Sequence, residues 1–192
     1  MLRNKIDKIR LLFRKDRESY SCFYRILGFY PRNIRLYEQA LLHKSTAVRS
    51  EKGRPLNNER LEFLGDAILD AIVGDIVYQH FEGKREGFLT NTRSKIVQRE
   101  TLNKLAVEIG LDKLIKYSTR SSSHNSYMYG NAFEAFIGAI YLDRGYECCK
   151  QFMERRIIEP YIDLDKLSRK EVNFKSKLIE WSQKTRWKFL SN

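Results

Sequence analysis

The chain has 192 residues, of which 42% are hydrophobic and 31% charged, a composition that suits one substantial folded domain and argues against general disorder. No apolar run reaches the roughly 18–20 residues of a membrane span, and no apolar segment follows the charged N-terminus as in a signal peptide. We therefore expect a cytoplasmic protein without a membrane partner. The three cysteines, of which Cys148 and Cys149 are adjacent, suit neither a disulfide framework nor a CxxC zinc site.

The net charge of +12 is concentrated at the two ends of the chain. Residues 1–49 carry a net charge of +8 and residues 150–192 a net charge of +5, whereas residues 50–149 carry −1. Basic ends are typical of proteins that bind a polyanion such as nucleic acid. General solubility is the alternative explanation that charge alone leaves open.

The hydrophobic periodicity predicts a chain that is helical almost throughout, with no internal repeat and no strand before residue 186. In chain order the expected helices cover residues 4–14, 34–43, 58–81, 90–97, 99–109, 111–116, 131–145, 147–160 and 173–184. Asn33 is the expected N-cap of the second helix, and Thr90 or Asn91 that of the fourth. Polar segments at 45–57 and 121–127 are expected to be loops, and 163–172 to be a linker.

The segment from Asn57 to Val73 is nearly as apolar as a buried core helix, yet it contains four acids. At about 100° per residue, these acids fall within an arc of about 80°: Glu59, Glu62, Asp66 and Asp70. Apolar residues cover most of the remaining circumference, so we expect the rest of this helix to be buried. Like charges at this spacing repel each other, so something must compensate them.

A second apolar helix carries Asn131 and Glu134 at i and i+3. If the two helices pack together, these side chains complete an all-oxygen site with Glu62 and Asp66. Hard oxygen donors without His or Cys favour Mg²⁺ or Mn²⁺ over zinc, and there is no ExxH pair for a di-iron bundle. Ion pairs with Lys or Arg, or a solvated acidic stripe, are the alternatives at this point.

Four motifs occur in an order and spacing that resemble the ribonuclease III family over about residues 20–160. The most specific is NERLEFLGDAIL at 58–69, which is similar to the family signature. The others are ALLHKS at 40–45, LTNTRSKIVQRETLNKLAVEIGL at 89–111 and NAFEAFIGAIYLDRGY at 131–146. In addition, NFKSKLIEWSQK at 173–184 is similar to the first helix of a double-stranded-RNA-binding domain.

The resemblance implies an all-α fold, the helical bundle of a ribonuclease III catalytic domain, over residues 1–165. A linker over 166–172 and the first helix of an α/β double-stranded-RNA-binding domain over 173–192 would follow. The latter domain also needs a three-stranded sheet and a second helix, so we expect a truncated chain.

The implied activity is Mg²⁺-dependent hydrolysis of phosphodiesters in double-stranded RNA, with Mn²⁺ able to substitute and no small-molecule cofactor. It would leave 5′-phosphate and 3′-hydroxyl ends with short 3′ overhangs during rRNA and mRNA maturation. By position, Glu62, Asp66 and Glu134 match the family's metal-binding carboxylates, with Asp66 and Glu134 as the catalytic pair and Glu59 as an accessory acid.

The resemblance further implies a homodimer in which Phe63 inserts into a socket on the partner, although Phe63 could equally belong to the core. Asn131 departs from the family pattern, which has Asp there, so we expect it to ligate Mg²⁺ more weakly. Basic residues Arg93, Lys95 and Arg99 are candidate phosphate contacts, or alternatively ordinary solvent-exposed charges.

Two other classes of function compete with the nuclease. A catalytically weak or inactive duplex-RNA-binding member of the same fold would explain Asn131 as a first sign of lost activity. A helical protein-interaction module is disfavoured because it gives no reason for the acidic stripe. His43 is a conceivable acid or base, but a lone histidine before a loop is more often structural.

Overall fold

The computed structural model describes residues 17–118 and 127–169. The expected helix at 4–14 and the expected RNA-binding segment at 173–192 lie outside the described residues. The chain divides into two units, Met1–Ile162 and Asp163–Asn192. Within the described ranges there is no strand, only two isolated bridges, so the expected all-helical architecture is confirmed for these residues.

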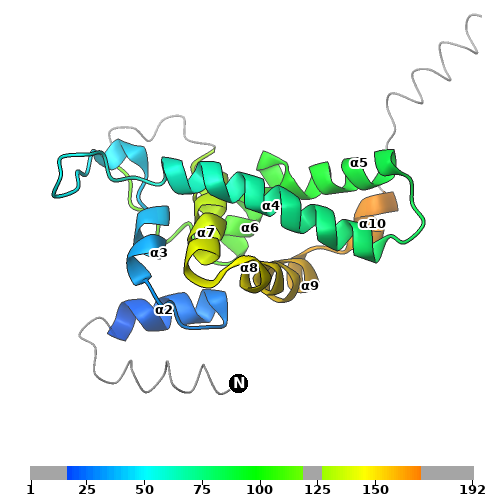
Figure 1. The fold of residues 1–192 in the computed structure, drawn as a ribbon, viewed down its shortest axis with the longest axis horizontal. Helices are drawn as coiled ribbons and strands as arrows, with labels where there is room; N and C mark the ends of the chain where they lie inside the picture. The colour runs from blue at the N-terminus through cyan, green and yellow to red at the C-terminus, as the bar shows by residue number, and fades with distance from the viewer. Residues whose placement is uncertain (1–16, 119–126, 170–192) are drawn as a thin grey trace, which may run out of the picture. The chain divides into compact units, whose positions relative to one another are not determined.

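Figure 1 shows the arrangement of the helices, with a long loop between η1 and α4. The first unit contains α2 (Arg17–Leu27), α3 (Ile34–Ala40), the 3₁₀ turn η1 (Lys44–Thr46), α4 (Glu59–His80), α5 (Glu86–Val97), α6 (Arg99–Glu108), α7 (Met128–Arg144), α8 (Tyr146–Phe152), the π-helical segment η3 (Met153–Ile158) and α9 (Glu159–Tyr161). The described part of the second unit contains α10 (Leu164–Arg169). No described helix is both long and apolar enough to cross a membrane.

Helix α7 is the centre of the first unit and packs against α3, α4, α6 and α8. It is apolar nearly all round, as expected for a helix surrounded by others. Phe133, Phe136, Ile137 and Ile140 are fully buried. The ring of Phe136 lies 5.5 Å from that of Tyr37 on α3, measured between centroids. This packing holds α7 in place, and its first two turns carry Asn131 and Glu134.

Helices α4 and α7 cross in direct backbone contact, which two glycines permit (Figure 1). A Cβ atom added at Gly65 would lie 1.7 Å from the carbonyl oxygen of Glu134, and one at Gly138 would lie 2.4 Å from that of Leu61. Real Cβ atoms do not approach backbone atoms so closely, so only glycine fits at either position. The crossing therefore fixes the backbone of Glu134 against the α4 turn between Glu62 and Asp66.

Helix α4 buries one face and leaves the other open. Its buried residues are Leu61, Gly65, Leu69, Ile72, Val73, Ile76 and Val77. On the other side Phe63 is 82% exposed, and Ala67 and Ala71 are also exposed. The expectation that all of the helix except its acids is buried is therefore wrong. The expectation of a continuous helix over about 58–81 is confirmed.

The start of α5 differs from expectation. The helix begins at Glu86, four residues before the expected cap. The hydroxyl of Thr90 donates to Glu86 Oε1 at 2.8 Å and that of Ser94 to the Thr90 carbonyl at 2.8 Å. These hydroxyls thus bond within the helix and do not cap it.

Two other segments also differ. Residues 111–116 form a turn rather than a helix, and the turn ends in a parallel bridge between Lys116 and Leu42. Residues 164–169 form α10 where a linker is expected. The expected N-cap Asn33 does precede α3, but its backbone N–H donates to Asp143 Oδ1 at 2.8 Å and its side chain makes no capping bond.

Candidate functional site

The crossing of α4 and α7 brings four sequence-predicted side chains together. Glu62 and Asp66 lie one turn apart on α4, and Asn131 and Glu134 lie one turn apart on α7. The Asn131 side chain on α7 lies close enough to the Glu62 carboxylate on α4 to lower its pKa. Asp66 is exposed and the other three are half-buried. We call these four residues the carboxylate cluster.

The pKa values of Glu134 and Glu62 in this cluster are raised, mainly by burial. Burial, followed by the charges of Asp66 and Glu62, raises the pKa of Glu134 to about 7, while Arg99 acts in the opposite direction. Burial is also the main cause of the raised pKa of Glu62. The pKa of Glu134 is therefore raised mainly because the carboxylate is removed from water, and the charges of Asp66 and Glu62 raise it further.

Ion pairs account for two of the four stripe acids, but not for the cluster. Lys44 Nζ lies 3.3 Å from Glu59 Oε1, and Arg93 Nε lies 3.8 Å from Asp70 Oδ1. In the described ranges, no Lys or Arg lies within ion-pair distance of Glu62, Asp66 or Glu134. Ion pairs therefore explain Glu59 and Asp70, and the metal-site hypothesis applies to Glu62 and Asp66.

The donor set of the cluster fits Mg²⁺ or Mn²⁺ in its chemistry. Three carboxylates and one amide are hard oxygen donors. Among the described residues, however, no three His, Cys, Asp or Glu side chains by themselves form a group that could hold an ion. Mg²⁺ is usually held by only one or two carboxylates together with waters and substrate phosphates. The fit thus relies on Asn131 and on oxygen atoms from outside the protein.

The raised pKa of Glu134 predicts a pH dependence of stability for the metal-free chain. Between the ordinary value of 4.5 and about 7, the folded state holds a proton that the unfolded state releases. The stability that this bound proton contributes is therefore lost as the pH rises through about 7, and it is recovered as the pH falls toward 4.5. Urea unfolding in EDTA at pH 5 to 8 should show a smaller decline in stability for Glu134→Gln than for the parent chain. If the free energy of unfolding declined equally with pH in both proteins, the raised pKa of Glu134 would be wrong.

The three candidate phosphate contacts occupy different surroundings. Arg99 is exposed near the cluster, where its charge lowers the pKa values of Glu62 and Glu134, and its guanidinium lies 4.2 Å from the centre of the Tyr127 ring. Arg93 and Lys95 are both half-buried residues of α5, and Arg93 lies beside Asp70 of α4. Of the three, Arg99 is the one beside the carboxylates.

His43 is buried and participates in local structure. It caps η1, with its Nδ1 accepting from the Ser45 backbone N–H at 3.2 Å and lying 2.8 Å from the Ser45 hydroxyl. Burial lowers the pKa of His43. Sequence analysis missed Lys44, the next residue, whose charge acts on both Glu59 and Glu62. Its position directly before the loop that leads into the acidic helix was the available signal.

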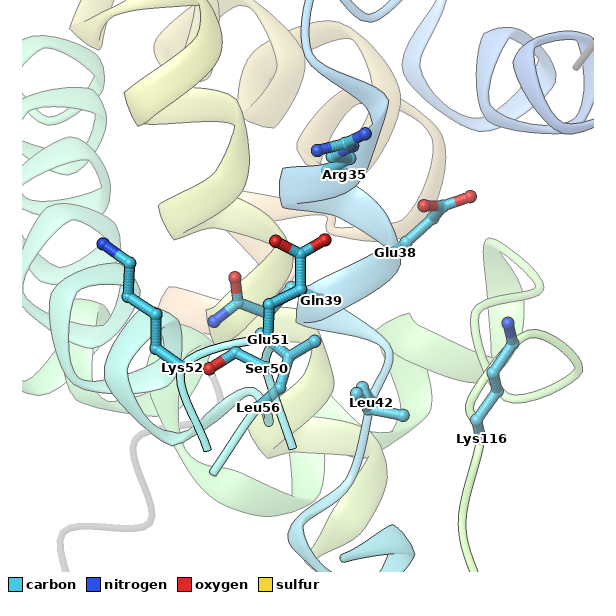
Figure 2. A pocket seen from close by; sticks show the side chains of 9 residues that line it. All are labelled: Arg35, Glu38, Gln39, Leu42, Ser50, Glu51, Lys52, Leu56 and Lys116. Carbon is cyan, nitrogen blue, oxygen red and sulfur yellow. The ribbon is translucent and has the colours of Figure 1, made fainter. Parts of the chain in front are cut away.

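One cavity in the part of the chain that the structure describes lies away from the cluster. It has a volume of about 630 Å³ and contains none of the four cluster residues. Figure 2 shows Arg35, Glu38 and Gln39 on α3, with Glu51 and Lys52 of the loop after η1 on one side of that helix and Lys116 on the other. The residues that line this cavity carry charges of both signs.

Comparison with known proteins shows the family of the chain. The family model described as ribonuclease-III-like matches residues 33–161, about two thirds of the chain. The chain belongs to this family. The ribonuclease 3 of Bacteroides fragilis is 99% identical over 186 residues, and that of Bacteroides thetaiotaomicron is 91% identical over 186 residues. The resemblance drawn from the sequence motifs is confirmed.

The ribonuclease III family fold is also found among solved structures. The nuclease domain of ribonuclease III from Campylobacter jejuni has 32% sequence identity and a TM-score of 0.64, covering 73% of this chain and 96% of that one. The two Bacteroides comparisons each cover 97% of this chain, but the chain spans only 64% and 60% of the length of those relatives.

Proposed function

We propose that the chain is the catalytic part of a Mg²⁺-dependent endoribonuclease that hydrolyses phosphodiesters in double-stranded RNA. Mn²⁺ can substitute for Mg²⁺, and the products carry 5′-phosphate and 3′-hydroxyl ends with short 3′ overhangs. The observation that carries the proposal is the grouping of three carboxylates and one amide where α4 crosses α7, with no Lys or Arg of the described ranges within ion-pair distance of these carboxylates. Burial and the neighbouring charges of Asp66 and Glu62 raise the pKa of Glu134 to about 7. The names of the Bacteroides relatives support the reaction type.

In this proposal Glu62, Asp66, Asn131 and Glu134 hold the metal, and Asp66 and Glu134 are the catalytic carboxylates. Mg²⁺, when bound, supplies Lewis acidity and lowers the pKa of a bound water. Glu134 must be deprotonated to contribute, so its raised pKa makes metal binding compete with a proton. Glu59 is accessory, and its pairing with Lys44 keeps its charge from adding fully to the cluster.

Asn131 distinguishes this chain from the family pattern, which has Asp there. A neutral amide cannot add a fourth negative charge, but the Asn131 side chain lowers the pKa of the neighbouring Glu62 carboxylate. We infer a weaker affinity for Mg²⁺ than an Asp would give, with activity retained. The same residue is what favours the second candidate, a catalytically weak duplex-RNA-binding protein.

The substrate contacts are proposed from charge. Arg99, beside the cluster, would bind a backbone phosphate near the site of cleavage, and Arg93 and Lys95 would lie further along the duplex. A-form RNA is recognised through phosphates and 2′-hydroxyls, so binding should weaken steeply with salt and depend little on sequence. We place this activity in cytoplasmic rRNA and mRNA maturation. Residues 1–165 would be catalytic, 166–172 the linker and 173–192 the start of an RNA-binding domain.

The proposal is tested by incubating the chain with long double-stranded RNA in Mg²⁺, in Mn²⁺ and in EDTA, and by mapping the product ends. We expect cleavage with either metal, none in EDTA, and 5′-phosphate ends. Binding without cleavage at any Mg²⁺ concentration would favour the inactive duplex-binding protein. No salt-sensitive binding of duplex RNA at all would contradict both candidates.

We further propose that the chain forms a homodimer through the exposed face of α4. Phe63, 82% exposed on that face, would insert into the partner. The Campylobacter jejuni nuclease domain supports a dimer, because it has a flexible region that is involved in dimer formation in that protein. A two-fold interface would contain Phe63 twice. Two acidic sites would then lie along one duplex, each cutting one strand.

Phe63→Ala should therefore weaken dimerisation strongly. Burying a large apolar side chain contributes about 1.5–3 kcal/mol, so losing two should raise the dimer dissociation constant at least about a hundredfold. Sedimentation velocity over a concentration series measures this constant. Leu142→Ala, at a residue 53% exposed on α7, is the matched control and should leave it unchanged. Equal effects of both variants would exclude Phe63 as the anchor.

A further inference from the structure

A second cavity, of about 530 Å³, lies between the turn after α2 and the α8–η3 segment. Four of its lining residues are arginines and none is a carboxylate: Arg32, Arg144, Arg155 and Arg156, with Cys148 and Gln151 between them. We call it the arginine cavity. It shares no residue with the carboxylate cluster. Its volume falls within the roughly 300–1,000 Å³ typical of small-ligand sites.

Two of the arginines are held in place by backbone carbonyl groups. Arg156 donates from Nε to the Ile26 carbonyl at 3.1 Å and also donates to the Arg25 carbonyl, both in the last turn of α2. Arg144 donates to the Tyr30 carbonyl at 2.6 Å. Because these contacts use only part of each guanidinium, the wall of the cavity remains positively charged and is already ordered.

Asp143, which precedes Arg144 in the sequence, is engaged in hydrogen bonds outside the cavity lining. Both oxygens of Asp143 accept hydrogen bonds, from the backbone N–H groups of Arg32 at 2.9 Å and Asn33 at 2.8 Å and from the Tyr37 hydroxyl at 2.9 Å. Its side chain is only 2% exposed, and 3.7 Å separates its Oδ2 from Arg144 Nε. Asp143 therefore neutralises at most one of the four arginines.

The other two arginines are available to a ligand. Arg32 and Arg155 are exposed, and in the described ranges their guanidinium groups form no hydrogen bond or ion pair. The thiol of Cys148 adds no negative charge, because burial raises its pKa. Arg155 also lies on the π-helical segment η3, a rare backbone geometry that is often found at functional sites.

We propose that the arginine cavity binds a phosphoryl oxyanion through Arg32 and Arg155, with Arg144 and Arg156 as its fixed positive wall. The planar guanidinium matches phosphate geometry by donating two parallel hydrogen bonds. The phosphate can belong to a small phosphomonoester or to a polynucleotide backbone, since both present the same oxygens. The site is independent of cleavage, so its test does not depend on the proposed nuclease activity.

The test is isothermal titration of the 192-residue chain with orthophosphate and with adenosine 5′-monophosphate, in EDTA at low ionic strength. We expect saturable binding, weakened on the order of tenfold by Arg32→Ala or Arg155→Ala. Arg155→Lys keeps the charge but not the planar guanidinium, so its phosphate affinity should lie between those of the parent and Arg155→Ala. Arg54→Ala, at an exposed loop arginine outside the cavity, is the control and should match the parent. Circular dichroism would verify that each variant is folded.

Binding of duplex RNA in EDTA separates the two sources of phosphate. If Arg155→Ala weakens duplex binding more than Arg54→Ala does, the ligand is the RNA backbone. If the two variants bind duplex equally and only small phosphates are affected, the ligand is a phosphomonoester. The proposal is overturned if the parent binds no phosphate up to about 10 mM, or if Arg54→Ala weakens phosphate binding as much as Arg155→Ala.

Discussion

Glu134→Gln should lower the rate of double-stranded RNA cleavage by roughly a thousandfold, the upper end of what removing one pre-organised electrostatic group costs. The substitution keeps the size of the side chain but removes the charge that would bind the metal and leaves an amide in its place. Duplex binding should persist, because the proposed phosphate contacts are arginines and lysines. Single-turnover cleavage and filter binding in EDTA measure the two quantities separately.

The same substitution should stabilise the metal-free protein at pH 8. There the parent holds an ionised Glu134 against Asp66 and Glu62 in a half-buried site, and the variant does not. Loss of cleavage together with gain of stability excludes misfolding as the cause, and such a trade-off is common at functional sites. Glu82→Gln, at an exposed position after α4, is the control for both measurements. A Glu134→Gln protein that cleaves at the parent rate would remove Glu134 from the mechanism.

Gly65→Ala should destabilise the fold by about 3 kcal/mol or more, at the upper end of overpacking costs. The new Cβ would meet the Glu134 carbonyl oxygen at 1.7 Å and its carbonyl carbon at 2.6 Å. These are backbone atoms and cannot rotate away, so α4 and α7 must separate. Urea unfolding measures the loss, and cleavage should fall as well because the crossing positions Glu62 and Asp66 against Glu134.

Gly87→Ala provides the matched control. This glycine is also helical, but a Cβ there meets nothing within 4 Å. The higher helix propensity of Ala should make the change neutral or stabilising by up to about 1 kcal/mol. If Gly65→Ala behaved in the same way, the close helix crossing would be wrong. The site geometry that depends on it would then also be wrong.

Local sequence patterns predicted the helices well where a long apolar period is bounded by clear breakers. Helix α4 was expected over about 58–81 and spans Glu59–His80, and α7 ends before Gly145 as expected. The start of α5 was missed because Thr90 bonds inside the helix. The turn at 111–116 was missed because its pairing partner, Leu42, is remote in sequence.

The sequence by itself determined the residue types of the carboxylate cluster, the family and the all-helical class, because motif spacing and hydrophobic period are local properties of the chain. Tertiary structure decided which acids remain without a counter-charge. Lys44 and Arg93 pair with Glu59 and Asp70, and neither pairing can be inferred from helix periodicity. It also decided that the face of α4 bearing Phe63 is open and that four arginines line one cavity. Electrostatic interactions depend on distances between segments that are far apart in sequence, and only the packing of the helices sets those distances.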